Sequence, residues 1–284
     1  MEFSNCIICD SKESFNIIEQ VNDRFSKKDI YLIQECSCGM IMLNPRKTEE
    51  KIFKHYNVNN YHPNNISSSM FGCLYKFAQR LNNEFKLKII KKYFKTGKAL
   101  DFGGGDGQFN AFLTKHNWLV DTYEPYIKSR LFRGKVINDL KKIEKNKYDL
   151  ITMFHSIEHI HKIDETLKKI KSALKKKCIL IIAIPNHNAY ERFFLKEKWV
   201  AYDAPRHLYH FNEKTIIMLL KKYGFQLIEK KPLLLDTFYN IIMSSQFNFK
   251  SVLKSTLLLI KSIFAILSNN DRSSSLIFTF RKYD

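Results

Sequence analysis

The stretch ALDFGGGDGQF at residues 99–109 decides the fold class. Residues 99–102 are mostly apolar, and a turn with glycine at 103, 104, 105 and 107 follows them. Glycine has no Cβ atom, so such a turn lets the main chain approach a bound ligand closely. A dinucleotide-binding turn reads Gly-x-Gly-x-x-Gly, and Gln108 stands here at the place of the third glycine. The stretch therefore predicts a strand and a ligand-binding turn that differs from the dinucleotide fingerprint.

Strand and helix patterns alternate along the chain after this turn. Such alternation predicts an α/β fold with a mostly parallel sheet and helices on both faces. An antiparallel pair near the end of the chain is expected to close the sheet. The predicted strands are residues 98–102, 118–123, 134–137, 148–153, 178–184, 225–231 and 275–281.

The chain divides into three parts by composition. Residues 1–45 are rich in cysteine, and residues 46–95 hold a connector and a long amphipathic helix that begins at Met70. Residues 96–284 are expected to form the main domain, with mostly helical insertions at 186–212 and 233–270. Both insertions follow strand ends, which is where an open α/β sheet binds its ligands.

Four cysteines in the first part have the spacing of a metal site. Cys6 and Cys9 form a C-x-x-C pair, and Cys36 and Cys38 form a C-x-C pair. In a reducing compartment two such pairs predict a structural zinc ion in a small zinc-ribbon-like module, because four thiolates close a tetrahedral site. The second pair is one residue shorter than a standard zinc knuckle, so reduced core thiols are the alternative.

The chain is strongly basic, with a formal net charge of +19, and its lysines outnumber its arginines 38 to 9. Lysine spread over nearly every segment favours a solvated basic surface, while a polyanion or an anionic membrane is the alternative partner.

No signal peptide or bilayer-spanning run is recognisable, so a cytoplasmic location is expected. The apolar stretch 252–268 contains Lys254 and Lys261. It is expected to pack on the main domain or to rest on a membrane surface.

The turn resembles the first motif of class I S-adenosylmethionine-dependent methyltransferases, in which Asp101, Gly103, Gly105 and Gly107 form D-x-G-x-G-x-G. The resemblance implies a Rossmann-like seven-stranded sheet, mostly parallel, with its last strand antiparallel. It also implies that the turn, Gly104 included, binds S-adenosylmethionine and that Asp101 lies near its amino-acid end.

Three downstream residues are assigned to the same cofactor. Glu124 ends the second predicted strand 19 residues after Gly105, where a carboxylate would accept hydrogen bonds from the ribose hydroxyls. Asp139 lies where the resemblance implies an adenine contact, although it could equally cap the next turn. His155 follows the fourth predicted strand and is expected to line the cofactor pocket.

Residues 149–186 resemble the block that follows strand four in this family. Glu158 and His159 form its "EH" pair, which implies roles at the reacting centre, and Asn186 ends the next strand and is assigned to the substrate. The alternatives are a helix N-terminal charge for Glu158 and a structural role for His159.

The stretch WVAYDAPRHLYHFNEKT at 199–215 resembles the substrate loop of bacterial methyltransferases that carry a cysteine-rich N-terminus. It is similar, more distantly, to the "EH" loop of sugar methyltransferases, in which a histidine is the base. The resemblance makes His207 the expected general base, with a substrate hydrogen bond or a structural role as alternatives. Arg206 replaces the glutamate that precedes this histidine in the family, and its planar fork suits a phosphate or carboxylate of the substrate.

The expected function is methyl transfer from S-adenosylmethionine to a small polar acceptor, most simply O-methylation of a sugar, a nucleotide-linked sugar or a surface-glycan precursor. A neutral hydroxyl needs a base to remove its proton, which is the role predicted for His207. A nucleic-acid methyltransferase that uses the basic surface is one alternative. A non-catalytic cofactor-binding protein is the other.

Overall fold

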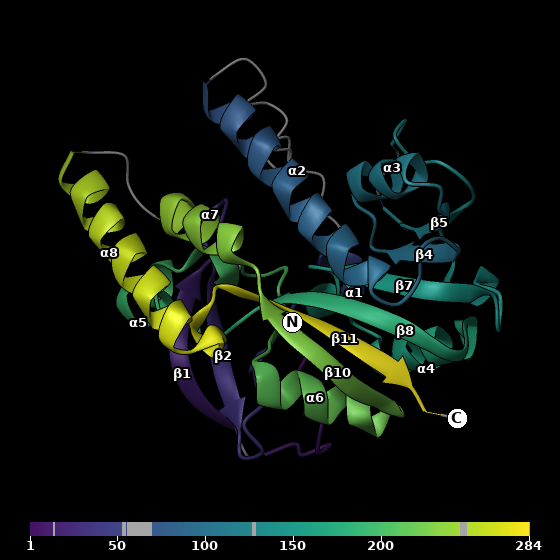
Figure 1. The fold of residues 1–284 in the computed structure, drawn as a ribbon. Coiled ribbons are helices and arrows are strands. Elements are labelled where there is room, and N and C mark those ends of the chain that lie inside the picture. Colours follow the sequence, from purple (N-terminus) through teal and green to yellow (C-terminus); the bar gives the residue numbers. More distant parts are fainter. Residues whose placement is uncertain (14, 53–54, 56–69, 127–128, 245–248, 284) are drawn as a thin grey trace.

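The structure is a computed structural model, and it describes residues 1–13, 15–52, 55, 70–126, 129–244 and 249–283. These residues form two sheets: a large sheet, against which most helices pack, and a smaller one near the N-terminus (Figure 1). In the part of the chain that is described, no helix is long and apolar enough to cross a membrane.

The large sheet has seven strands in the order β10-β11-β8-β7-β4-β5-β6. Neighbouring strands from β8 to β6 run parallel, and β11 runs antiparallel to both β8 and β10. This order and the antiparallel last strand confirm the predicted class I methyltransferase fold. The strands are β4 (Lys98–Phe102), β5 (Leu119–Tyr123), β6 (Val136–Ile137), β7 (Tyr148–Phe154), β8 (Leu174–Pro185), β10 (Phe225–Pro232) and β11 (Ser275–Lys282).

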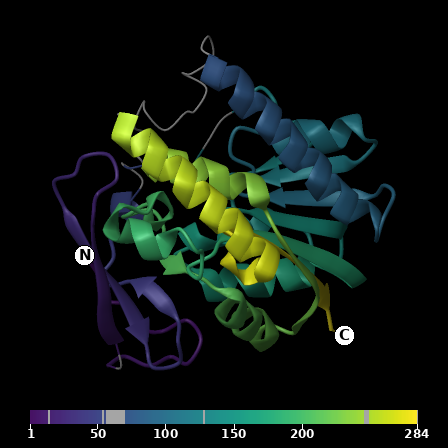
Figure 2. The same cartoon turned by 60° about the vertical axis from the view of Figure 1, so that its left-hand side comes forward.

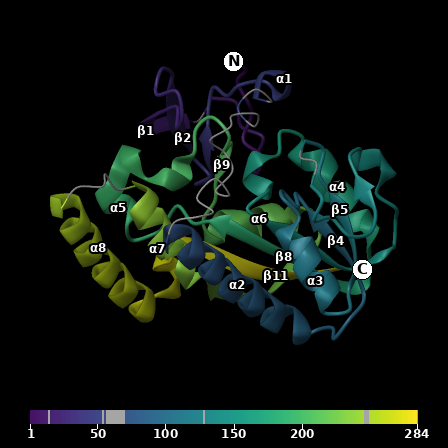
Figure 3. The same ribbon diagram turned by 90° about the horizontal axis from the view of Figure 1, so that it is seen from above.

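Helices cover both faces of the large sheet (Figure 3). Strand side chains alternate between faces, so the apolar run of β8 serves two cores. Ile179 and Ile181 pack with α2 (Met70–Lys91) and α3 (Gln108–Lys115), whereas Leu180 and Ile182 pack with α4 (Ile163–Ala173) and α6 (Glu213–Lys222). A continuous apolar strand is thus explained by burial on both sides.

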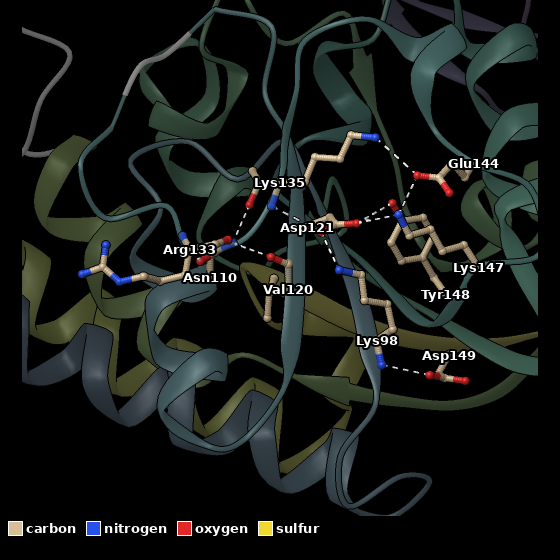
Figure 4. A network of polar contacts seen from close by, with 11 residues as sticks. Lys98, Asn110, Val120, Asp121, Arg133, Lys135, Glu144, Lys147, Tyr148 and Asp149 are labelled. Carbon is tan, nitrogen blue, oxygen red and sulfur yellow. Dashed lines mark hydrogen bonds and ion pairs between the residues drawn. The ribbon is translucent and has the colours of Figure 1, made fainter.

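A polar network surrounds β5 in the large sheet (Figure 4). Asp121 accepts hydrogen bonds from Lys98 Nζ at 2.6 Å and from the Tyr148 hydroxyl at 3.1 Å. Asn110 on α3 exchanges hydrogen bonds with the main chain of Arg133, which precedes β6. These contacts tie β4, β5, β7 and α3 together, and the Gly103 amide donates to the Tyr123 carbonyl, which holds the carboxyl end of β5 beside the glycine turn.

The small sheet joins the N-terminal part to the first insertion (Figure 2). Its strands β1 (Phe15–Asn22), β2 (Ile30–Cys36) and β3 (Ile41–Leu43) form an antiparallel meander, and β9 (Tyr209–His210) adds beside β3. Tyr31 and Ile33 pack with Trp199 and Tyr202 of that insertion. The cysteine-rich part therefore shares a sheet and a core with the predicted substrate loop.

The second insertion is mostly helical, whereas the first is mostly irregular. The first holds α5 (Arg192–Leu195) and short 3₁₀ turns, and the second holds α7 (Leu234–Ser244) and α8 (Phe249–Ser268). The remaining helix, α1 (Glu49–Ile52), follows the small sheet. Of the predicted connector, residues 53–54 and 56–69 lie outside the described residues.

Candidate functional site

A cavity of about 470 Å³ lies at the carboxyl ends of β4, β5 and β7. Its wall includes the glycine turn, Glu124, Asp139, His155 and His159. This is the edge at which an open α/β sheet binds ligands. Five residues assigned to the cofactor from sequence line it: Gly103, Gly105, Glu124, Asp139 and His155.

Some glycines of the turn face the cavity, and others pack closely against neighbouring side chains. Gly105 has a φ of +54°, and a Cβ atom there would meet nothing within 4 Å. At Gly104 and Gly107 a Cβ atom would lie 2.5 Å from the Thr122 side chain and 2.7 Å from the Phe132 ring. Gly104 and Gly107 are absent from the described cavity wall, so close packing accounts for both of them.

Asp101 presents an unpaired acceptor beneath the turn. Its side chain is buried, Oδ1 accepts a hydrogen bond from the Thr152 hydroxyl at 2.8 Å, and Oδ2 has no hydrogen-bond partner among the described residues. Burial raises the pKa of this carboxyl to about 6. An unsatisfied buried carboxylate oxygen suits a cationic ligand group such as the ammonium of S-adenosylmethionine.

Glu124 is held in place by the main chain of the cavity wall. Its Oε2 accepts from the Gly105 amide at 3.0 Å and its Oε1 accepts from the Tyr126 amide at 3.1 Å. A carboxylate oxygen can accept more than one hydrogen bond, so this placement suits ribose hydroxyls. Asp139 also lines the wall, and its Oδ1 accepts from the Lys141 amide at 2.9 Å as the cap of a 3₁₀ turn.

His155 is a cation between two carboxylates at the cavity wall. Its Nε2 lies 3.2 Å from Asp236 Oδ2 and its Nδ1 lies 3.7 Å from Glu158 Oε1. Burial alone would lower the pKa of His155, but these two carboxylates raise it to about 9. Asp236 comes from α7, and Asn82 of α2 donates to its Oδ1 at 3.0 Å. Sequence reasoning missed Asp236, because no local pattern links α7 to the end of β7.

Three of the predicted catalytic side chains come together beside this cation. One donor atom from each of Glu158, His159 and His207 lies within 4.8 Å of the other two, and the two imidazole rings meet edge to face at 4.6 Å. Glu158 is fully buried, and neither of its carboxylate oxygens accepts a hydrogen bond from the described residues. The group has the chemistry to share a proton or to hold a divalent cation.

The hydrogen bonds of the two histidines set their tautomers. His159 Nδ1 donates to the Arg206 carbonyl at 3.1 Å, and His207 Nδ1 donates to the Ala201 carbonyl at 2.8 Å. A carbonyl only accepts, so the lone pair of each neutral ring resides on Nε2. Burial lowers the pKa of His159 to about 4 and also lowers the pKa of His207. His159 lines the cavity, while His207 is not among the described wall residues.

The two predicted substrate residues make internal contacts. Arg206 is buried, and its Nη2 donates to both carboxylate oxygens of Asp203 at 2.6 Å. This cation holds the pKa of Asp203 well below its usual range, although burial opposes ionisation. Asn186 is also buried and donates to the carbonyls of Asp271 and Ser273. Neither residue lines the described cavity, so their substrate contacts stay predictions.

The four cysteines gather into one cluster, as the spacing predicts. Cys6 Sγ lies 3.5 Å from Cys38 Sγ, and Cys9 Sγ lies 3.5 Å from Cys36 Sγ. All four sulfurs lie within 4.8 Å of one another, and none of these cysteines forms a disulfide. These separations and this donor set fit a tetrahedral zinc site. Tight turns present both pairs: the Asp10 amide donates to the Cys6 carbonyl and the Gly39 amide to the Cys36 carbonyl.

Comparison with known proteins agrees with this geometry. The family model described as a methyltransferase domain matches residues 75–230. No curated protein sequence matches the chain. Among solved structures, the chain resembles the Burkholderia thailandensis 1,6-didemethyltoxoflavin N1-methyltransferase bound to its substrate and S-adenosylhomocysteine. The TM-score is 0.55 at 12% identity, over 94% of this chain and 100% of that chain. This likeness concerns the fold.

Another similar solved structure is an S-adenosylmethionine-dependent methyltransferase from Archaeoglobus fulgidus. Its TM-score is 0.48 at 17% identity, over 72% of this chain and 94% of that chain.

Proposed function

We propose that this chain, which belongs to the methyltransferase-domain family and is an S-adenosylmethionine-dependent methyltransferase, methylates a hydroxyl group of a small polar acceptor. The acceptor class is a sugar, a nucleotide-linked sugar or a glycan precursor. His207 is the general base. The observation that carries the proposal is the cluster of His159, His207 and buried Glu158, in which His159 lines the cofactor cavity and contacts the His207 ring.

The cavity wall and the buried Asp101 beneath it offer a matching group for each part of the cofactor. The unpaired Oδ2 of Asp101 would receive the ammonium group, and the protonated imidazole of His155 would face the carboxylate. Glu124 would bind the ribose, and Gly105 leaves room for close approach of the ligand. When bound, S-adenosylmethionine supplies an electrophilic methyl group on sulfur. The chain's task is then to align the acceptor and to remove its proton.

The histidine pair supports the proton-transfer step. His207 Nε2 would accept the hydroxyl proton as the acceptor oxygen takes the methyl group that bound S-adenosylmethionine would supply, with the electron pair of the broken carbon–sulfur bond left on sulfur. Burial keeps the histidine pair neutral at physiological pH, so Nε2 can accept this proton. The Glu158 carboxylate, within 4.8 Å, would stabilise the imidazolium that forms. His159 lines the cavity and its ring contacts His207.

The test is methyl transfer from labelled S-adenosylmethionine to a panel of sugars, nucleotide-linked sugars and RNA, with and without a metal chelator. We expect label in a hydroxyl-bearing sugar compound, with activity that persists in chelator and changes little with salt. Transfer to RNA with binding that weakens steeply as salt rises would favour the nucleic-acid alternative instead. Loss of sugar methylation in chelator while zinc stays at the cysteine cluster would assign Glu158, His159 and His207 to a divalent cation and remove His207 as the base.

The cysteine cluster is proposed to hold one structural zinc ion through Cys6, Cys9, Cys36 and Cys38. Cys6 and Cys36 are part of the same apolar core as Tyr209 and Phe211, so the ion would brace the small sheet against the main domain. Elemental analysis of protein purified without added metal is expected to give one zinc per chain. If the purified protein holds no metal, has four titratable thiols at the cluster and keeps the same thermal stability when zinc is added, the cysteines are reduced core thiols instead.

A further inference from the structure

The outward face of α8 is apolar, and none of the described residues covers it. Its side chains at Leu253, Leu257, Ile260, Phe264 and Leu267 are between 46% and 75% exposed. They recur every three or four residues, so they form one continuous stripe along the helix. Figures 1 and 3 show α8 at the outer edge of the molecule, and in Figure 2 it lies in front of the other elements.

The opposite side of α8 supplies its packing to the protein. Ser262 and Ile266 are buried, and the helix packs beside α7. The helix therefore has an inward face that anchors it and a separate apolar face that the described residues leave open. Exposed apolar stripes of this length on a protein surface mark an interaction site.

Positive charge accompanies the stripe. Lys254 and Lys261 are exposed and each follows a stripe residue directly, at Leu253 and Ile260. The sequence of α8 contains no aspartate or glutamate. Just beyond its end, the guanidinium groups of Arg272 and Arg192 lie 5.5 Å and 4.3 Å from the centre of the exposed Phe193 ring.

We propose that the α8 stripe docks on an anionic lipid surface. Its apolar side chains would enter the interface between head groups and acyl chains, and its lysines would meet lipid phosphates. A second copy of the chain is the less favourable occupant. In a symmetric helix pair, lysines would face a stripe that has no carboxylate to pair with them. The net charge of +19 adds a long-range attraction toward anionic lipid.

The insertion that carries the docked face begins beside the reacting centre. The α7–α8 insertion follows β10, which runs parallel to β8, so it begins at the same sheet edge as the cavity. On α7, Asp236 pairs with His155 in the cavity wall. The acceptor would accordingly be a polar group carried by a lipid, such as a lipid-linked sugar. This assignment of the acceptor rests on the proposed function, whereas the docking does not.

The test is cosedimentation of the whole protein with phosphatidylcholine vesicles, with and without phosphatidylglycerol. We expect binding to the anionic vesicles, and binding at least about tenfold weaker for Lys254→Glu/Lys261→Glu, because two favourable charges become unfavourable. Leu253→Ser/Phe264→Ser should weaken binding comparably by removing apolar insertion. The matched controls, Lys145→Glu/Lys176→Glu and Leu119→Ser, change exposed lysines and an exposed leucine elsewhere and should bind as the wild type does.

Two results would overturn the docking proposal. One is failure of the wild type to bind anionic vesicles at low salt, or equal binding by the α8 variants. The other is a dimer in sedimentation velocity that the α8 variants dissociate, since that would make a second copy the occupant. Calorimetric titration of the α8 variants with S-adenosylmethionine separates this proposal from the proposed function. Intact cofactor binding with lost vesicle binding isolates the docking face, whereas vesicle binding without methyl transfer to any sugar rejects only the acceptor.

Discussion

The glycine turn at residues 103–107 and the loop at residues 203–207 both lie beside the cavity, but they differ in where their polar groups point. Gly105 leaves open space at the cavity wall, and Asp101 beneath the turn keeps an unpaired oxygen. In the loop, Arg206 Nη2 donates to both carboxylate oxygens of Asp203, and His207 Nδ1 donates to the Ala201 carbonyl. The turn leaves space and a polar atom for a ligand, whereas most polar groups of the loop bind one another.

This difference limits what the loop can contribute to chemistry. Its Asp203–Arg206 pair is buried, and Arg24 Nη1 adds a contact 3.3 Å from Asp203 Oδ1. Those charges support the shape of the loop and so position the His207 ring against His159. The atom of His207 that is left for the reaction is Nε2, which lies 3.6 Å from Asp203 Oδ2. Substitutions in the turn should therefore change ligand binding, and those in the loop should change stability or turnover.

The largest expected effect is on turnover, and it comes from the reactive atom of the loop. His207→Ala removes the base, and we expect kcat to fall by about 100-fold to 10,000-fold with little change in cofactor affinity. Labelled methyl transfer together with cofactor titration measures both. His116→Ala, a partly exposed histidine on the α3 side of the sheet, is the control. Wild-type turnover in the His207 variant would leave His207 with a structural role.

The second effect tests whether the rest of the loop is a scaffold. Arg206→Met leaves Asp203 buried with a weakened set of partners, and we expect a loss of about 3 kcal/mol in the free energy of unfolding. Lys168→Met breaks the exposed Lys168–Asp164 pair and should cost less than about 0.5 kcal/mol. Urea denaturation compares the two. A stable Arg206→Met protein with impaired acceptor binding would reverse the comparison and make Arg206 a substrate contact.

The third effect tests whether the turn serves the ligand. Gly105→Ala and Gly39→Ala both place a side chain at a positive φ where a Cβ atom meets nothing within 4 Å. Each should lose about 1 kcal/mol of stability from the left-handed backbone. Only Gly105→Ala puts a methyl group into the cavity wall, so only this variant should also bind S-adenosylmethionine more weakly. Equal cofactor affinity in the two variants would mean that the ligand does not approach Gly105.

The smallest effect is a pH dependence of cofactor binding. The pKa of Asp101 is raised to about 6 by burial, so the carboxyl becomes protonated below that pH and can no longer pair with an ammonium group. At pH 6 about half of the sites are ionised, and the affinity for S-adenosylmethionine should fall about twofold from its value at pH 7.5. Asp101→Asn should bind weakly and lack this dependence. The same dependence in that variant would assign it to another group.

Local sequence patterns were enough to predict the glycine turn and the sheet around it, but not the contacts of the loop at residues 203–207. The strands of the large sheet, the glycine turn, Glu124 and the cysteine cluster each follow from residue spacing within a short segment. The contacts that shape the loop join distant segments: β9 pairs with β3, Asp236 reaches His155, and Arg24 meets Asp203. Such pairings depend on how the chain returns to the sheet edge, and a single sequence carries no local signal for them.

The most direct test of the account is isothermal titration calorimetry with S-adenosylmethionine, with NAD as the control ligand, on the wild type and on Glu124→Ala. The account predicts saturable binding of S-adenosylmethionine alone, weakened at least about tenfold by loss of the carboxylate that would hold the ribose. Binding of NAD, absence of binding, or an unchanged affinity in Glu124→Ala would contradict the assignment of the cavity to this cofactor.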